Sequence, residues 1–451
     1  MDFLCFERRI DNSNPEYCRK NLKRRDKVYE ISDVMQQVDE RTNELLELLE
    51  NLIRFRTESP PARNTRQAQN FVADYLKSLG FTIDQWELYP GDDNVVGVQN
   101  GSDAKTHKSL LLNGHIDVVE VDSSERWVSN PFEPKIENGK IIGRGTADMK
   151  GGLAGSLFAL KLLKEHEMKL GGDITFESVV GEEAGEAGTL ECCRRGYTSD
   201  FAIVCDTSDN QIQGQGGVIT GWITLKDNQI YHDGIRGQLL KDAPEANKNI
   251  STIEKMTAVI ASLQQLEQQW VNTKFYRDIP TCTTTINPAV IKGGRNAAFI
   301  ADECHLWITV HFLPHENYQE VTKEIEHFVT TTIKSDPWFK ENPPIFTWGG
   351  QSMIEEEGEI FPPLELQKGS LGVETLAKHH QQIHKEQASI GMSSTVTDGG
   401  WLGEFGIDTA IYGPGKLEHA HQINEELSIA DLVNFTKTMI ATIYDWTNQP
   451  K

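Results

Sequence analysis

The chain alternates short apolar segments with helical ones, and this alternation constrains the fold more than any other feature of the sequence. Residues 109–113, 174–180 and 201–205 are largely apolar and short, which is typical of strands buried on both faces. Helices are predicted over residues 38–55, 65–79 and 150–163 from the spacing of their apolar residues. Strands that alternate with helices predict an α/β sheet.

The segment after Gly214 follows a different pattern. A strand near residues 218–225 is followed by a helix over 251–271, strands near 281–287 and 304–312, and a helix over 318–333. This order predicts a small ferredoxin-like α+β unit. The last hundred residues return to the first pattern and end in a helix over 427–446. We therefore expect an extension over 1–34 that is poorly ordered, a large domain made of 35–213 and 339–451, and an inserted domain over 214–338.

Size and composition agree with a two-domain protein and exclude some partners. A chain of 451 residues exceeds the size at which a single core usually stops growing. The formal net charge of −23 argues against nonspecific nucleic-acid binding, and no apolar run is long enough to span a membrane. The seven cysteines form no paired spacing, and residues 1–30 lack the apolar core of a signal peptide, so a reduced, cytoplasmic location is expected.

Five motifs place imidazole or carboxylate groups near the ends of strand-like runs. They are L-L-L-N-G-H-I-D with His115 and Asp117, G-R-G-T-A-D-M-K-G-G with Asp148, V-V-G-E-E-A-G with Glu182 and Glu183, I-V-C-D with Asp206, and G-P-G-K-L-E-H-A-H-Q-I-N-E with His421. An α/β sheet presents its functional groups at the carboxyl ends of its strands. Two histidines and three carboxylates form a ligand set suited to zinc, cobalt or manganese, and one bridging aspartate would let them hold two ions. Of the adjacent glutamates, one would bind metal and the other would accept a proton from water.

Each motif alone has a plainer interpretation. The His115 motif could be a surface turn, Asp148 could cap the helix that follows it, and the two glutamates could lie in a solvated loop. His419 competes with His421, because both lie on the same face of an extended segment. The combination of the five motifs favours the metal site.

Together and in this order, the motifs and the inserted unit resemble the metallo-amidohydrolase family of acetylornithine deacetylase, succinyl-diaminopimelate desuccinylase, aminoacylase and carboxypeptidase G. The resemblance covers residue 35 to the C-terminus. It implies a zinc-exopeptidase-like three-layer catalytic domain with an inserted dimerisation (lid) domain, and a homodimer formed through that lid. It also implies one metal on His115, Asp148 and Asp206, a second on Asp148, Glu183 and His421, Glu182 as general base, and Asp117 as the residue that orients His115.

The resemblance also suggests residues that contact the substrate. His232 matches a lid histidine that reaches the partner subunit's site and stabilises the developing oxyanion; its alternative is an exposed loop histidine. The remaining matches to substrate-contacting segments are Arg295 and Asn296 on the lid, and Thr397, Asp398 and Gly399 in a loop of the catalytic domain.

Two positions depart from the family pattern. Asp206 stands where the deacetylases usually have glutamate, and His311 stands where many relatives have an arginine that holds the substrate carboxylate. The expected activity is the metal-dependent removal of an acyl group from a small N-acyl amino acid or amine. A dipeptidase or aminopeptidase, a formylaminopyrimidine deformylase, and a noncatalytic dimeric binding protein stay open as alternatives. The acidic run at residues 355–357 could attract a cationic substrate or form a solvated loop.

Overall fold

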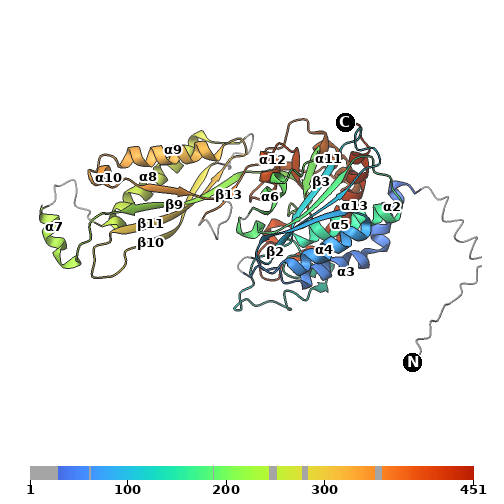
Figure 1. Cartoon of the computed structure of the whole chain (residues 1–451), viewed down its shortest axis with the longest axis horizontal. Helices are drawn as coiled ribbons and strands as arrows, with labels where there is room; N and C mark the ends of the chain where they lie inside the picture. The colour runs from blue at the N-terminus through green and yellow to red at the C-terminus, as the bar shows by residue number, and fades with distance from the viewer. Residues whose placement is uncertain (1–28, 60–61, 186, 243–250, 277–282, 351–357) are drawn as a thin grey trace, which may run out of the picture.

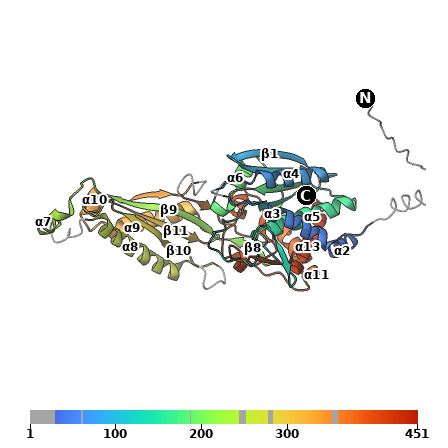
Figure 2. The same cartoon turned by 90° about the horizontal axis from the view of Figure 1, so that it is seen from below.

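The computed structural model describes residues 29–59, 62–185, 187–242, 251–276, 283–350 and 358–451. It confirms the predicted α/β class. The described residues form a large sheet with helices on both faces and a second, smaller sheet that extends from it, which gives the molecule an elongated shape (Figures 1 and 2). No helix in this part of the chain combines the length and the apolar character needed for a membrane crossing.

The large sheet has eight strands in the order β1-β2-β6-β3-β7-β15-β8-β14. Strands β3, β6 and β7 are mutually parallel neighbours at its centre, and β15 continues parallel to β7. The bounds of these strands are β1 Thr82–Tyr89, β2 Asp92–Gln99, β3 Leu110–His115, β6 Ile174–Val179, β7 Phe201–Val204, β8 Ile212–Gln215, β14 Ile390–Ser393 and β15 Thr409–Ile411.

Successive side chains of the central strands point to opposite faces of the sheet and pack against a helical layer on each face. Leu110 and Leu112 of β3 belong to the main core, whereas Leu111 belongs to a separate core on the other face. This division follows from the two-residue period of a strand. The helices of the first layer are α2 Ile31–Glu40, α3 Thr42–Arg54, α4 Arg66–Leu79, α5 Lys150–Glu165, α11 Leu371–His384 and α13 Ile429–Thr447; those of the second are α6 Gly188–Arg194 and α12 Gly399–Glu404.

The smaller sheet contains β9 Gly217–Lys226, β10 Thr285–Gly293, β11 Glu303–Phe312 and β12 Ile345–Trp348, and β13 Ile360–Phe361 pairs with β9. Helices α8 Thr252–Thr273 and α9 Tyr318–Ile333 pack on one face of it and bury an apolar core. The short helices α7 Arg236–Asp242 and α10 Trp338–Glu341 complete this unit. The inserted domain was expected to end at residue 338. Strands β12 and β13 lie after this residue and both pair with β9, so they belong to the smaller sheet.

Two further differences concern the N-terminal region and a small third sheet. The predicted extension, residues 1–34, lies mostly outside the described residues, and α2 begins within it at Ile31. The single helix expected over 38–55 is divided at Arg41 between α2 and α3. The third sheet consists of β4 Lys135–Glu137, β5 Lys140–Ile142 and β16 Glu426–Ser428. It joins the segment before Asp148 to the segment after His421.

Candidate metal centre

Three parallel strands end at the same edge of the large sheet and bring three of the motifs together. His115 is the last residue of β3, Glu182 and Glu183 follow β6 in a short 3-10 turn, and Asp206 follows β7. Neighbouring parallel strands present their carboxyl ends on one side, so motifs separated by up to about ninety positions become neighbours.

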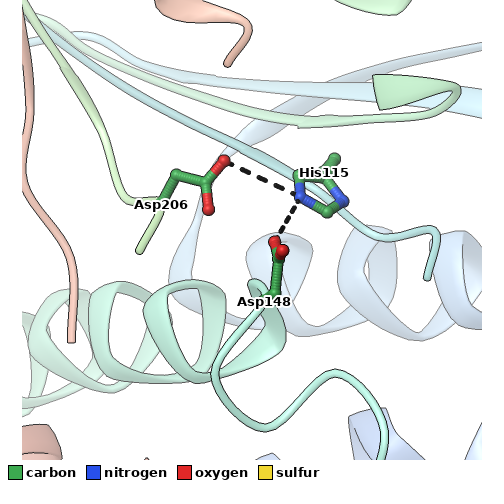
Figure 3. A group of neighbouring side chains, drawn as sticks. All are labelled: His115, Asp148 and Asp206. Carbon is green, nitrogen blue, oxygen red and sulfur yellow. Dashed lines mark hydrogen bonds and ion pairs between the residues drawn. The ribbon is translucent and has the colours of Figure 1, made fainter. Parts of the chain in front are cut away.

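The first group of possible metal ligands contains His115, Asp148 and Asp206. Nε2 of His115 lies 3.2 Å from Oδ1 of Asp148 and 3.8 Å from Oδ2 of Asp206 (Figure 3). All three side chains are buried, and one ligand atom from each lies within 4.8 Å of the others. This spacing is compatible with a single ion held by one imidazole and two carboxylates.

The second group shares Asp148 with the first. Nε2 of His421 lies 3.2 Å from Oδ2 of Asp148 and 2.8 Å from Oε2 of Glu183, and these atoms again lie within 4.8 Å of one another. The two oxygens of Asp148 therefore face different histidines. His419 belongs to neither group; its Nδ1 lies 3.3 Å from the carbonyl oxygen of Glu426.

The charges of this region favour cations. Burial raises the pKa of Glu182 well above its usual value and that of Asp206 to about 8. Among the described residues, no lysine or arginine forms an ion pair with the acids Asp117, Asp148, Glu182, Glu183 and Asp206. Oε1 of Glu183 is buried without a hydrogen-bond partner. Buried carboxylates at such density are costly unless cations compensate them, so the donor set fits divalent metal ions.

Asp117 lies beside His115 and also contacts the turn that carries the two glutamates. Its Oδ1 lies 3.7 Å from Nδ1 of His115, whereas its backbone carbonyl oxygen lies 3.0 Å from that nitrogen. A carbonyl oxygen can only accept, so Nδ1 carries the proton and Nε2 is left with a lone pair for a metal. The carboxylate of Asp117 instead accepts hydrogen bonds from the backbone N–H groups of Gly181 and Glu183. The hydrogen bond to Nδ1 of His115 thus comes from the backbone of Asp117, and the side chain of Asp117 also positions the glutamate turn.

Glu425, the last residue of the His421 motif, has a role that its sequence did not indicate: it holds the Asp148 loop. Its Oε1 accepts from the backbone N–H groups of Ala147 (2.8 Å) and Asp148 (3.0 Å), and its Oε2 accepts from the backbone of Gly145 (3.0 Å) and from Arg144 (2.9 Å). The carboxylate is 1% exposed, and burial raises its pKa to about 7. Four donors on one buried carboxylate fix the direction in which Asp148 points. No local sequence signal identifies this role, because the donors lie 277–281 positions away.

We expect Glu425→Gln to weaken metal binding without removing a ligand. The glutamine NH2 group would face backbone N–H groups that need an acceptor, so the Asp148 loop would shift. Losses at residues that support metal ligands are typically 10–100-fold in metal affinity. Titration of the apo variant with zinc would measure this loss. Exposed Glu404→Gln serves as the matched control, and an unchanged affinity in Glu425→Gln would contradict the role.

A cavity of about 400 Å³ opens onto the two ligand groups. Of the substrate residues predicted in the catalytic domain, Thr397 lines the cavity, whereas Asp398 and Gly399 do not. Asp398 is 2% exposed, and burial raises its pKa to about 6. Among the lining residues that were not predicted are Glu359 and Phe361, from the segment that pairs with β9. The nearby acidic run at residues 355–357 lies outside the described residues.

The predicted lid residues do not meet the metal groups of the same chain. His232 is 67% exposed and directly precedes the turn leading into α7, which lies at the end of the molecule away from the large sheet (Figure 1). Arg295 forms an ion pair with Asp302, and the side-chain oxygen of Asn296 accepts from the backbone of Ala298. His311, at the other end of β11, lines a second cavity together with Met392 and Thr395.

Comparison with known proteins agrees with this geometry. The model of peptidase family M20/M25/M40 matches residues 111–445. The chain belongs to this family. It is 52% identical over 425 residues to the N-formyl-4-amino-5-aminomethyl-2-methylpyrimidine deformylase of Halalkalibacterium halodurans, with 94% of this chain and 99% of the relative covered. The deformylase of the same name from Bacillus subtilis is also 52% identical, over 422 residues, with 94% of this chain and 99% of the relative covered.

More distant family members share the fold. A succinyl-diaminopimelate desuccinylase from Ralstonia nicotianae is 26% identical over 404 residues, covering 85% of this chain and 94% of the relative. An M20 family metallo-carboxypeptidase from Sulfolobus solfataricus superposes with a TM-score of 0.69 at 16% identity, covering 90% of this chain and 100% of that one. A dinuclear metal-binding peptidase of the family from Bacillus subtilis gives 0.63 at 14% identity, with 90% and 98% covered. The M20 chain described here is an amide hydrolase with a possible metal site, as the sequence predicted.

Proposed function

We propose that this M20 hydrolase removes the formyl group from N-formyl-4-amino-5-aminomethyl-2-methylpyrimidine. The observation that carries the proposal is the 52% identity to two deformylases of this name over nearly their whole length. A feature of the chain agrees with it. The resemblance described above implies that His311 stands where many relatives have an arginine that holds a substrate carboxylate, and a formylaminopyrimidine has no carboxylate to hold.

We propose that His115, Asp148 and Asp206 hold one divalent ion, and that Asp148, Glu183 and His421 hold a second. Zinc suits this nitrogen and oxygen set, and cobalt or manganese are the alternatives. When bound, two such ions supply a Lewis acid for the amide carbonyl and lower the pKa of water. The metal content of the purified protein tests this assignment, because active enzyme free of divalent ions would contradict it.

Glu182 is the proposed general base. Its Oε2 lies 3.8 Å from Nε2 of His115, it lines the cavity, and it belongs to neither ligand group. In the proposed reaction Glu182 takes a proton from the attacking water as the new C–O bond forms at the formyl carbon. It then delivers that proton to the departing nitrogen as the C–N bond breaks. Formic acid and the free amine are the products, and the formic acid then releases its proton to solvent as formate forms, so atoms and charges balance.

The proposed active form is a homodimer in which His232 of one lid reaches the metal centre of the partner and stabilises the oxyanion. Exposure of His232 and its distance in the fold from the metal groups of its own chain support a role in trans. We expect His232→Ala to be nearly inactive. We expect an equimolar mixture of His232→Ala and Glu182→Gln subunits to regain up to about one quarter of wild-type activity, because about half of its dimers are mixed and each mixed dimer has one intact site of two. Verified mixed dimers without recovery would contradict the role.

The substrate assignment is tested by amine release from a panel. It contains the formylaminopyrimidine, N-acetylornithine, N-succinyl-diaminopimelate and simple dipeptides, each with added zinc and with chelator. The expected result is metal-dependent turnover of the formylaminopyrimidine, with kcat/KM at least about 10²-fold above the other compounds. Preferential cleavage of a dipeptide or a succinyl amide would replace the proposal with that activity.

We further propose a cytoplasmic location. Its support is that Cys192, Cys193, Cys205 and Cys304 are buried and form no disulfide in the described part of the chain. Fractionation of cells that express the tagged protein would test it, and recovery in the secreted fraction would contradict it.

A further inference from the structure

One carboxylate in the metal-site cavity has no task in the proposed reaction. Glu359 lines the cavity from the segment that leads into β13. Its backbone N–H donates to Oγ1 of Thr220 on β9, and β13 continues in register with β9 from Ile360. The backbone that carries Glu359 is therefore held by the smaller sheet, while its side chain lines a cavity of the larger domain.

The side chain of Glu359 packs against the turn that carries the proposed base. Gly185 follows Glu182 and Glu183, and a Cβ atom at position 185 would come within 2.7 Å of the Cβ of Glu359. The absence of a side chain at Gly185 thus leaves room for Glu359. The contact places this carboxyl group beside the metal centre, on a different element from every ligand.

Glu359 has no partner for its carboxyl oxygens among the residues that the structure describes. Several other acids near the centre do have partners: Asp117 and Glu425 accept backbone hydrogen bonds, and one oxygen each of Glu183 and Asp148 faces His421. Burial alone raises the pKa of Glu359, with no contribution from a neighbouring charge. A half-buried carboxyl group without a donor is suited to a ligand that brings one.

We propose that Glu359 and Phe361 bind the aminopyrimidine ring of the substrate and make the enzyme specific for it. The inference rests on the deformylase function proposed above. A 4-aminopyrimidine presents an amino N–H donor next to a ring nitrogen. One oxygen of a carboxyl group can accept a hydrogen bond from that amino group. The other oxygen can share a proton with the ring nitrogen, so the two groups form a pair of hydrogen bonds. The same two-point geometry underlies the recognition of adenine and guanine edges by planar side chains.

Phe361 supplies the second contact. It is 5% exposed and lines the same cavity as Glu359 and the metal ligands Asp148 and Glu183. An aromatic side chain favours a planar heteroaromatic ring by stacking. With the ring at Glu359 and Phe361, the aminomethyl arm extends toward the metal ligands, where its formamide is cleaved. The cavity, at about 400 Å³, is of the size that holds a single-ring ligand.

The decisive experiment compares two formamides in wild-type and Glu359→Ala enzyme. One is the formylaminopyrimidine; the other is N-formylbenzylamine, whose ring has similar size but neither the amino group nor the ring nitrogens. We expect Glu359→Ala to lower kcat/KM for the pyrimidine by about 50-fold or more, since a hydrogen-bonding site discriminates strongly. The value for N-formylbenzylamine should stay within about threefold. Exposed Glu404→Ala is the matched control and should change neither.

The possible outcomes separate the two proposals. If wild-type enzyme does not deformylate the pyrimidine, the proposed function fails and the ring assignment falls with it. If wild-type enzyme does so but Glu359→Ala retains its preference, or loses both activities equally, the role of Glu359 alone is overturned. Calorimetric binding of 4-amino-2,5-dimethylpyrimidine, which carries no amide, adds a readout independent of turnover. We expect Glu359→Ala to weaken this binding at least about tenfold, and unchanged binding would overturn the inference.

Discussion

Replacement of Glu182 by glutamine is expected to lower kcat by about 10³-fold, in the middle of the range for loss of a general acid–base group. The amide has nearly the shape of the carboxylate but cannot accept the proton of the attacking water. Metal content should stay at the wild-type level, because Glu182 belongs to neither group of ligand atoms. The measurement is kcat for the formylaminopyrimidine together with bound metal per chain.

The control for this prediction is Glu133→Gln, a change of the same chemistry at an exposed position. Its kcat should equal that of the wild type. Retained turnover in Glu182→Gln would show that another group moves the proton. Loss of bound metal in that variant would instead assign Glu182 to the ligand set.

Replacement of Asp148 by asparagine is expected to remove both metal sites and to lower activity by about 10³-fold or more. One oxygen of Asp148 faces His115 and the other faces His421, each at 3.2 Å, so a single change disturbs both groups. Loss of several kcal/mol of charge stabilisation in the transition state corresponds to this factor. Chelator treatment of the wild type should reproduce the loss, and added zinc should reverse it only in the wild type.

Variants that replace a ligand of only one of the two metal groups give the matched comparison. Asp206→Asn should weaken one site and Glu183→Gln the other, so each is expected to retain one metal per chain when Asp148→Asn retains none. Exposed Asp122→Asn should retain both. Two tightly bound ions in Asp148→Asn would contradict the shared role of this carboxylate.

The local elements of the fold could be predicted because their patterns are local. The helix expected over 65–79 is α4, Arg66–Leu79, and the strand expected over 174–180 is β6, Ile174–Val179. Apolar spacing and a terminal Gly80 suffice to identify such elements. The strands β12 and β13 were missed because each is short and depends on pairing with β9. A strand of two to four residues is too short to show an alternating apolar and polar pattern, so the sequence does not indicate it.

The candidate site divides in the same way. His115, Asp148, Glu183, Asp206 and His421 were recognisable because their motifs lie near strand ends, where an α/β sheet presents its functional groups. Glu425 and Glu359 were not recognisable. Each is an acid in an irregular segment of an acidic chain, and only long-range contacts distinguish them from surface residues.

The fold class, the family and the types of candidate ligand could be predicted from the sequence alone, because they follow from periodicity and from side chains at strand ends. The tertiary structure decided how those groups are held. It showed that the backbone carbonyl of Asp117 forms the hydrogen bond to His115, and that Glu425 supports the Asp148 loop. It also brought Glu359 from the smaller sheet into the cavity of the larger domain. These contacts join residues from distant parts of the chain, and only the packing of the folded domains determines which of them meet.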